Sequence, residues 1–142
     1  QEVHPMAGIE GLIRTEDNGG LSFGNYEIAV KTKVSGYECG GSLYKVKTFK
    51  EMTRLEKNEL FFYESEPGTV VTSLTENADG MSFTVEGPDN AQITVAGEPG
   101  ADYVIFLNGK TADEVRATLG GKVSFSVEFE NGSGIDVRLV RQ

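Results

Sequence analysis

The sequence predicts an all-β protein, an antiparallel β-sandwich of immunoglobulin-like or jelly-roll type. Three observations support this prediction. Apolar and polar residues alternate in short runs, turn-forming residues separate these runs, and the runs recur about every 8–12 residues. Most of the 18 glycines lie at the breaks between runs, which favours many short strands over long helices. Strands with one polar and one apolar face are what two packed sheets require.

The clearest alternation lies near the C-terminus. In residues 122–130, valine and phenylalanine alternate with serine and glutamate, and residues 135–140 repeat this pattern with isoleucine, valine and leucine. Strict alternation places the apolar side chains on one face of a strand. The sequence Asn-Gly-Ser-Gly at 131–134 can reverse the chain, because glycine and asparagine tolerate positive φ. The two runs are therefore predicted to pair as an antiparallel hairpin.

Other runs are expected to form strands in the same way. Residues 36–41 are predicted to interrupt the chain, and Pro67 and Gly68 to occupy the centre of a type II turn. Residues 103–107 are apolar throughout, which predicts burial on both faces, and Asn108-Gly109 is the strongest hairpin signal. The expected strands cover residues 9–15, 21–23, 26–34, 43–48, 60–64, 69–75, 81–86, 91–95, 103–107 and 111–118.

Residues 49–57 fit two interpretations. Thr48 and Glu51 have the spacing of a capping box, and the apolar residues that follow recur at helical spacing, which favours one short helix. The alternative is a strand that turns at Lys57-Asn58 into the run at 60–64. The β-rich surroundings favour this hairpin.

Length and charge limit the classes of protein that are compatible with the sequence. The chain has 142 residues, which fits one domain, and we expect residues 1–5 to be a remnant before a native start at Met6, so that the domain spans 6–142. The net charge of -9 repels phosphate backbones and anionic lipids, so neither nucleic acid binding nor membrane insertion is expected. With Cys39 as the single cysteine and no visible signal peptide, we expect a cytoplasmic location, while export without a leader stays open.

The sequence contains no recognisable catalytic set. Its single histidine, His4, lies in the expected remnant, so a Ser-His-Asp or Cys-His arrangement is not predicted, and zinc lacks its usual ligands. Among the 22 acidic residues, no local pattern singles out a carboxylate pair for glycoside hydrolysis. No cofactor, no metal and no catalytic residue are predicted.

A group of lysines is the candidate for ligand binding. Lys31 and Lys33 share one strand face, and Lys45 and Lys47 share another. If the two strands are neighbours, the four ammonium groups form a basic stripe that could hold an acidic glycan or an acidic protein segment. Tyr44, on the opposite face of the strand from Lys45 and Lys47, is the aromatic candidate for ligand binding, although most tyrosines are expected at sheet rims with the hydroxyl in water. The alternative is an ordinary solvated face whose lysines discourage edge pairing.

Several segments resemble a known family. The match covers nearly all of 6–142, and the family consists of small proteins from anaerobic, Gram-positive, gut-type bacteria that carry the label "endosialidase". The C-terminal half also resembles the β-sandwich modules that adjoin carbohydrate-active domains in bacterial proteins. The resemblance implies a carbohydrate-related role, but it matches no catalytic motif, so it assigns no catalytic residue. The segments that carry it are residues 13–15, 23–26, 43–51, 62–65, 67–69, 83–88 and 119–122.

Two functions from different classes are compatible with these observations. The first is a non-catalytic β-sandwich module of a bacterium that recognises an acidic glycan or a protein partner and assembles with itself through strand edges. The alternative is a small carbohydrate-active enzyme, an endosialidase-like glycoside hydrolase, or an accessory subunit of a larger enzyme. An enzyme of this kind requires a cleft with two carboxylates about 5–10 Å apart. The absence of a catalytic motif favours the binding module.

Overall fold

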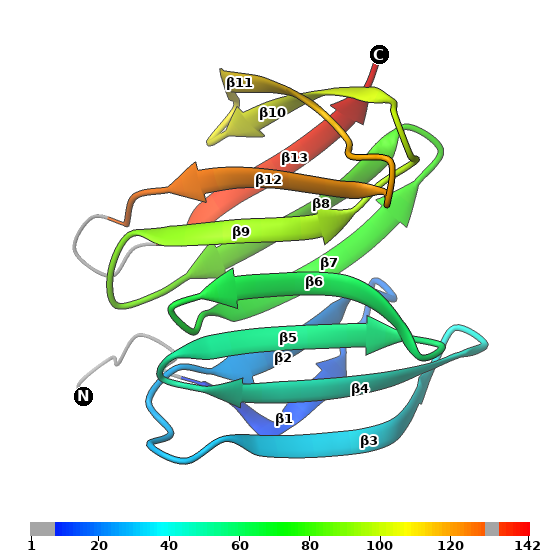
Figure 1. Ribbon diagram of the computed structural model, residues 1–142. Helices are drawn as coiled ribbons and strands as arrows, with labels where there is room; N and C mark the ends of the chain where they lie inside the picture. The colour runs from blue at the N-terminus through cyan, green and yellow to red at the C-terminus, as the bar shows by residue number, and fades with distance from the viewer. Residues whose placement is uncertain (1–7, 130–133) are drawn as a thin grey trace.

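The computed structural model describes residues 8–129 and 134–142, and these residues form thirteen β-strands in two antiparallel sheets packed face to face (Figure 1). Sheet A has the strand order β1-β2-β7-β8-β13-β10-β11, and sheet B has the order β12-β9-β6-β5-β4-β3. The predicted all-β sandwich is confirmed. The strands are β1 (Gly8–Thr15), β2 (Leu21–Asn25), β3 (Thr32–Cys39), β4 (Ser42–Phe49), β5 (Met52–Lys57), β6 (Leu60–Glu66), β7 (Val70–Asn77), β8 (Gly80–Glu86), β9 (Ala91–Ala96), β10 (Asp102–Leu107), β11 (Lys110–Arg116), β12 (Lys122–Val127) and β13 (Ile135–Arg141).

The C-terminal alternation forms strands with the predicted faces. Val123, Phe125 and Val127 of β12 are buried between the sheets, whereas Ser124 and Ser126 are exposed. Strand β13 follows the same rule, with Ile135, Val137 and Leu139 buried. The period of two therefore predicted correctly which side chains enter the core.

The predicted hairpin between these two strands is wrong. Strand β12 pairs with β9 at the edge of sheet B, whereas β13 lies between β8 and β10 in sheet A (Figure 1). Both arrangements bury one apolar face per strand, and alternation alone does not specify which sheet each strand joins. Residues 131–133 of the turn expected at 131–134, and the expected remnant at 1–5, lie outside the described residues.

The N-terminal half differs from the prediction at residues 26–41. Residues 26–31 form no strand, and Val30 is 74% exposed. Strand β3 instead begins at Thr32 and continues through the predicted break to Cys39. Its register against β4 shifts between Val34 and Tyr37, and Gly36 adopts a φ of 70° there. A bulge of this kind lets a strand continue past a glycine that would otherwise be read as a break.

The hairpin interpretation of residues 49–57 is confirmed. Strand β4 ends at Phe49, β5 follows, and β6 begins at Leu60. Asn58 and Glu59 have φ values of 52° and 70°, which suits a tight turn between antiparallel strands. No helix occurs at any of these positions.

Two further connections were predicted with mixed success. Asn108 and Gly109 form the expected hairpin turn, with φ values of 52° and 82°, between β10 and β11. The predicted type II turn at Pro67 is wrong, because the Glu66–Pro67 peptide is cis and the segment carries the chain from sheet B to sheet A.

The predicted burial of residues 103–107 on both faces is also wrong. Val104 and Phe106 of strand β10 remain half-exposed on the outer side of sheet A.

The centre of the core joins the two sheets through aromatic rings. Tyr63 of sheet B is fully buried, and its ring makes edge-to-face contacts with Phe23 and Phe83 of sheet A at centroid separations of 5.2 and 5.7 Å. Such pairs contribute about 0.5–1.5 kcal/mol beyond the burial of their area. The expectation that tyrosines lie at wet sheet rims is therefore wrong for Tyr63, and also for Tyr103, which is 5% exposed.

A buried chain of hydroxyl groups runs beside these rings. The Tyr63 hydroxyl lies 2.7 Å from Thr69 Oγ1, and Ser65 Oγ lies 2.8 Å from the same atom. Thr53 Oγ1 accepts a hydrogen bond from the Thr69 backbone N–H at 3.1 Å and lies 2.8 Å from Thr48 Oγ1. Among the described residues no buried side-chain polar atom lacks a partner, as a stable core requires. The described residues also contain no helix long and apolar enough to cross a membrane.

The first prediction tests this hydroxyl chain. Thr53→Val keeps the side-chain shape but leaves the buried Thr69 N–H without its acceptor. Because such a group costs about 1–3 kcal/mol, we expect the free energy of unfolding in urea to fall by that amount. Thr94→Val is the matched control, since it removes a hydroxyl bonded to Ser124 on the outer face of the same sheet. Thr94→Val should change stability by less than about 0.5 kcal/mol. Equal losses in both variants would show that the buried hydroxyl chain does not stabilise the fold.

Candidate functional site

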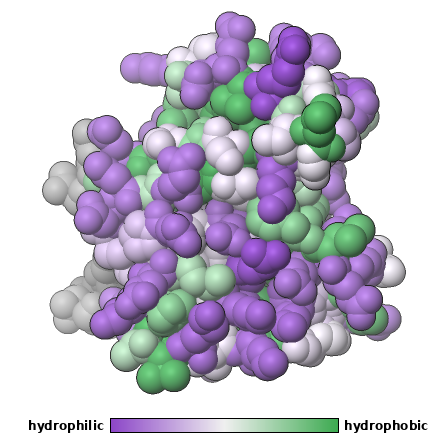
Figure 2. Space-filling view, in the orientation of Figure 1, coloured by the Kyte–Doolittle hydropathy of each residue, from purple (hydrophilic) through white to green (hydrophobic). Residues whose placement is uncertain are grey.

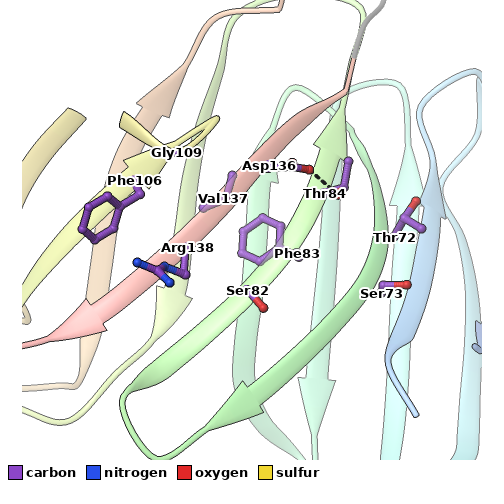
Figure 3. Close-up of a pocket in the computed structure, with 10 residues that line it drawn as sticks. All are labelled: Thr72, Ser73, Ser82, Phe83, Thr84, Phe106, Gly109, Asp136, Val137 and Arg138. Atoms are coloured by element: carbon purple, nitrogen blue, oxygen red, sulfur yellow. Dashed lines mark hydrogen bonds between the residues drawn. The ribbon is translucent and has the colours of Figure 1, made fainter. Parts of the chain in front are cut away.

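The candidate site is a groove on the outer face of sheet A, crossing β7, β8, β13 and β10 (Figure 3). Its volume is about 460 Å³, within the range of ligand pockets. Hydroxyl, carboxylate, guanidinium and aromatic groups all border it. The lining residues are Thr72, Ser73, Ser82, Phe83, Thr84, Phe106, Gly109, Asp136, Val137 and Arg138.

The floor of the groove is polar because the outward positions of three neighbouring strands carry hydroxyl and carboxylate groups. Thr72, Thr84 and Asp136 lie directly opposite one another across β7, β8 and β13. Thr84 Oγ1 donates a hydrogen bond to Asp136 Oδ1 at 2.8 Å, which fixes the carboxylate (Figure 3). Ser82 follows on the same face of β8. These groups can donate to and accept from the hydroxyls of a ligand.

An arginine and a phenylalanine form one end of the groove. Arg138 of β13 lies directly opposite Phe106 of β10, and its Cζ atom lies 4.8 Å from the ring centroid. Figure 3 shows the two side chains next to each other. Within residues 8–129 and 134–142, Arg138 has no carboxylate within salt-bridge distance, so its guanidinium N–H groups can bind an anion.

A strained residue forms the opposite end. Ser73 has a φ of 56°, which is uncommon for a residue other than glycine, and it lies where the register of β7 against β8 shifts. A chain of hydrogen bonds holds it there: the Ser73 N–H donates to Ser22 Oγ at 3.0 Å, and Ser22 donates to Glu16 Oε2 at 2.5 Å. Strained backbone of this kind is concentrated at functional sites.

The β10–β11 turn is fastened to the strand that carries Arg138. Asn108 Oδ1 accepts from the Asp136 N–H at 2.9 Å, and the Asn108 N–H donates to the Asp136 carbonyl at 2.8 Å. The two bonds hold the turn against β13 beside Asp136. The predicted Asn-Gly turn therefore has a second role, which is to close one side of the groove at Gly109.

The lysines predicted from the sequence lie on the other side of the molecule. Lys45 and Lys47 alternate with inward residues of β4, and Lys33 of β3 lies directly opposite Lys47, so these three share the outer face of sheet B. Lys31 precedes β3, and its Nζ atom lies 5.6 Å from the Phe49 ring centroid. Tyr44 does not join them.

Tyr44 points into the sandwich. Its ring packs edge to face against Phe62 at a centroid separation of 6.4 Å, and burial raises the pKa of its hydroxyl. It lines a cavity of about 330 Å³ between the sheets, together with Cys39 and Lys57. The structure thus brings three of the five predicted residues together and places Tyr44 on the opposite face of sheet B.

Sequence reasoning missed the groove. Alternation marks Ser82, Thr84, Asp136 and Arg138 as outward residues, and this is the signal that the sequence does contain. It does not reveal that β8, β13 and β10 are neighbours, because these strands are far apart in the chain.

Comparison with known proteins identifies no relative: no family model matches the chain, and no curated protein or solved structure matches it. The fold and the groove define the class, an antiparallel β-sandwich with a polar groove on one outer face.

The second prediction concerns the carboxylate that holds the Ser73 end. Hydrogen bonds from Ser22 and Arg14 lower the pKa of Glu16 below its ordinary value of 4.5. A carboxyl group with a lowered pKa stabilises the fold above its ordinary pKa, and that stability is lost as the pH falls below it. We therefore expect Glu16→Gln to lose less stability than the wild type between about pH 5 and pH 3.

The measurement is urea denaturation across that pH range. Glu10→Gln, which changes an exposed carboxylate in β1, the strand that precedes Glu16, is the control and should follow the wild-type curve. If Glu16→Gln also follows the wild-type curve, the Glu16 contacts do not stabilise the groove.

Proposed function

We propose that the protein is a non-catalytic binding module that recognises an acidic saccharide in the groove of sheet A. The observation that carries the proposal is the pairing of Arg138, which has no partner carboxylate in the described residues, with Phe106 at the end of a hydroxyl-lined groove. Such a site would recognise a ligand that combines an anionic hydrogen-bond acceptor, a ring and several hydroxyl groups.

Each group has a role that follows from its chemistry. The planar guanidinium of Arg138 matches a carboxylate through two parallel hydrogen bonds. Phe106 offers an apolar face on which the C–H groups of a sugar ring can pack. Thr72, Ser82 and Asp136 can exchange hydrogen bonds with sugar hydroxyls along the floor.

The alternative is an endosialidase-like hydrolase, and the carboxylates favour binding over it. In the part of the chain that the structure describes, Asp136 is the one carboxylate that lines the groove, whereas hydrolysis uses two about 5–10 Å apart. A second cavity, of about 290 Å³, is lined by Glu76, Asp79 and Glu98. Two of these already have cationic partners: Glu76 binds Lys57 at 2.6 Å, and Glu98 binds Arg141 at 2.5 Å.

A carboxyl group that acts as a general acid needs a raised pKa. Burial raises the pKa of Glu86, but this residue accepts a hydrogen bond from the Tyr26 hydroxyl at 3.3 Å and does not line the groove. An accessory role beside a larger enzyme is compatible with the binding module, because such a subunit needs a ligand site and no chemistry of its own.

Assembly through strand edges is the second part of the proposal, and one edge suits it best. Among the four edge strands of the described sheets, β1, β3 and β11 pair with their neighbours through register shifts, whereas β12 pairs with β9 without any. Bulges protect edges against added strands, so a regular edge such as β12 is where a further strand would pair.

The third prediction tests the groove. Isothermal titration with oligomers of sialic acid and of galacturonic acid should show binding that their carboxyl-reduced forms lack. Arg138→Gln should weaken it by about 10–150-fold, since a hydrogen bond to a charged group contributes about 1.5–3 kcal/mol. Phe106→Ala should weaken it by about 2–10-fold.

Arg116→Gln is the matched control, because Arg116 also lies in sheet A but pairs with Asp102 at 2.8 Å outside the groove. It should bind like the wild type. Equal binding by Arg138→Gln and Arg116→Gln, or no binding of either oligomer by the wild type, would exclude the groove as an acidic-saccharide site.

A further inference from the structure

The outer face of sheet B carries a row of cations across its strands. Lys33 of β3, Lys47 of β4 and Arg54 of β5 lie directly opposite one another. Lys45 is two residues from Lys47 on the same face of β4, which separates their Cα atoms by about 6.8 Å. Directly opposed residues are closer still, with Cβ atoms about 4.5–5.5 Å apart. We call Lys33, Lys45 and Lys47 the lysine face.

Arg54 has carboxylate partners, whereas the lysine face has none among the residues that the structure describes. Arg54 Nη1 lies 2.6 Å from Glu64, and its Nε atom lies 3.4 Å from Glu56. Glu56 is directly opposite Lys45, yet the carboxylate contacts Arg54. Among residues 8–129 and 134–142, no carboxylate oxygen lies within 4.0 Å of the three lysine ammonium groups.

This arrangement is unfavourable for the isolated protein. Like charges directly opposite in an antiparallel pair destabilise it, and the Lys33–Lys47 and Lys47–Arg54 pairs are both of that kind. The chain has 22 acidic residues against 13 basic ones, so basic residues are the scarcer type. Three lysines on one face, none with a salt-bridge partner in the described part of the chain, therefore need an explanation.

Protection of the sheet edge explains one of these lysines. Lysine on an edge strand discourages pairing with other chains, and Lys33 lies on β3, the edge of sheet B. Lys45 and Lys47 lie on β4, which is already paired on both sides, so they protect no edge. A ligand that neutralises all three ammonium groups accounts for the whole set.

The surroundings indicate an extended ligand. Figure 2 shows this side of the molecule, with sheet B in front, as a largely hydrophilic surface. The lysines border neither the groove nor the other cavities described above. The positive region continues along the face from Lys47 to Phe49, over whose ring Lys31 lies. A flat surface with charges at several points matches a polymer that bears repeated anionic groups.

We propose that the lysine face binds a sulfate- or phosphate-bearing polymer. Lysine ammonium groups are compact point charges whose rotatable donors can reach a tetrahedral oxyanion from several directions, without the fixed planar geometry of the arginine fork in the groove. The two surfaces lie on opposite faces of the sandwich, so this proposal does not depend on the groove.

The fourth prediction measures binding of dextran sulfate and polyphosphate, with uncharged dextran as the blank. The wild type should bind at least one of the two anionic polymers, and the polymer that binds identifies the ester. The Lys33→Gln/Lys45→Gln/Lys47→Gln variant should bind at least about tenfold more weakly. Its plot of log affinity against log salt should also be flatter by about one unit per lysine.

Two controls separate this outcome from other causes. The Lys110→Gln/Arg116→Gln/Arg141→Gln variant has the same net charge as the test variant but changes only cations of sheet A, and it should bind like the wild type. Arg138→Gln should also bind dextran sulfate normally, so a failure of the groove proposal would not be mistaken for a failure of this one.

The proposal is overturned if the test variant binds as tightly as the wild type. It is also overturned if the wild type prefers polygalacturonate, whose charges are carboxylates, to both tetrahedral polymers. A stability measurement adds a second criterion. Lys47→Gln should raise the urea midpoint at low salt and not at high salt, because it relieves repulsion that salt screens. A lowered midpoint would show that Lys47 serves the fold and would overturn the proposal.

Discussion

The buried hydroxyl chain at one end of the core fixes how the two sheets sit against each other. The Asn25 N–H, at the end of β2 in sheet A, donates to Thr48 Oγ1 of sheet B at 2.9 Å. Thr69, which leads into β7 of sheet A, is held by Thr53 and Tyr63 of sheet B. Hydrogen bonds of this kind are directional, whereas apolar packing alone allows sheets to slide. The order of groups on both outer faces depends on this alignment and on the strand register.

Both candidate surfaces arise from the same alternation that builds the core. On sheet A, the outward positions of β8 and β13 carry Ser82, Thr84, Asp136 and Arg138. On sheet B, those of β4 carry lysines. A slip of one residue in either sheet would move these side chains inward and bring apolar ones to the surface. Core and surfaces are thus specified by one register.

The sequence predicted which face of each strand is buried better than it predicted which strands pair. It identified Phe125 and Val127 as core residues, because burial follows from the period of two within one strand. It wrongly paired β12 with β13, because each strand could satisfy its apolar face in either sheet. The sequence could predict the lysine face, because β3 and β4 are joined by a short turn and therefore pair with each other. The groove was not, because its lining comes from strands whose adjacency depends on the order of the whole sheet.

The acidity of the whole chain affects how anions can approach the two cationic surfaces. With a net charge of -9, the protein as a whole repels anionic polymers at a distance. At physiological salt this repulsion extends about 8 Å, so unpaired cations act on groups that come close to them. Under the two proposals, an anion is held only where it meets Arg138 or the lysine face directly. A more basic protein would attract polyanions over its whole surface and lose this discrimination, so the acidic background favours selective recognition over general charge attraction.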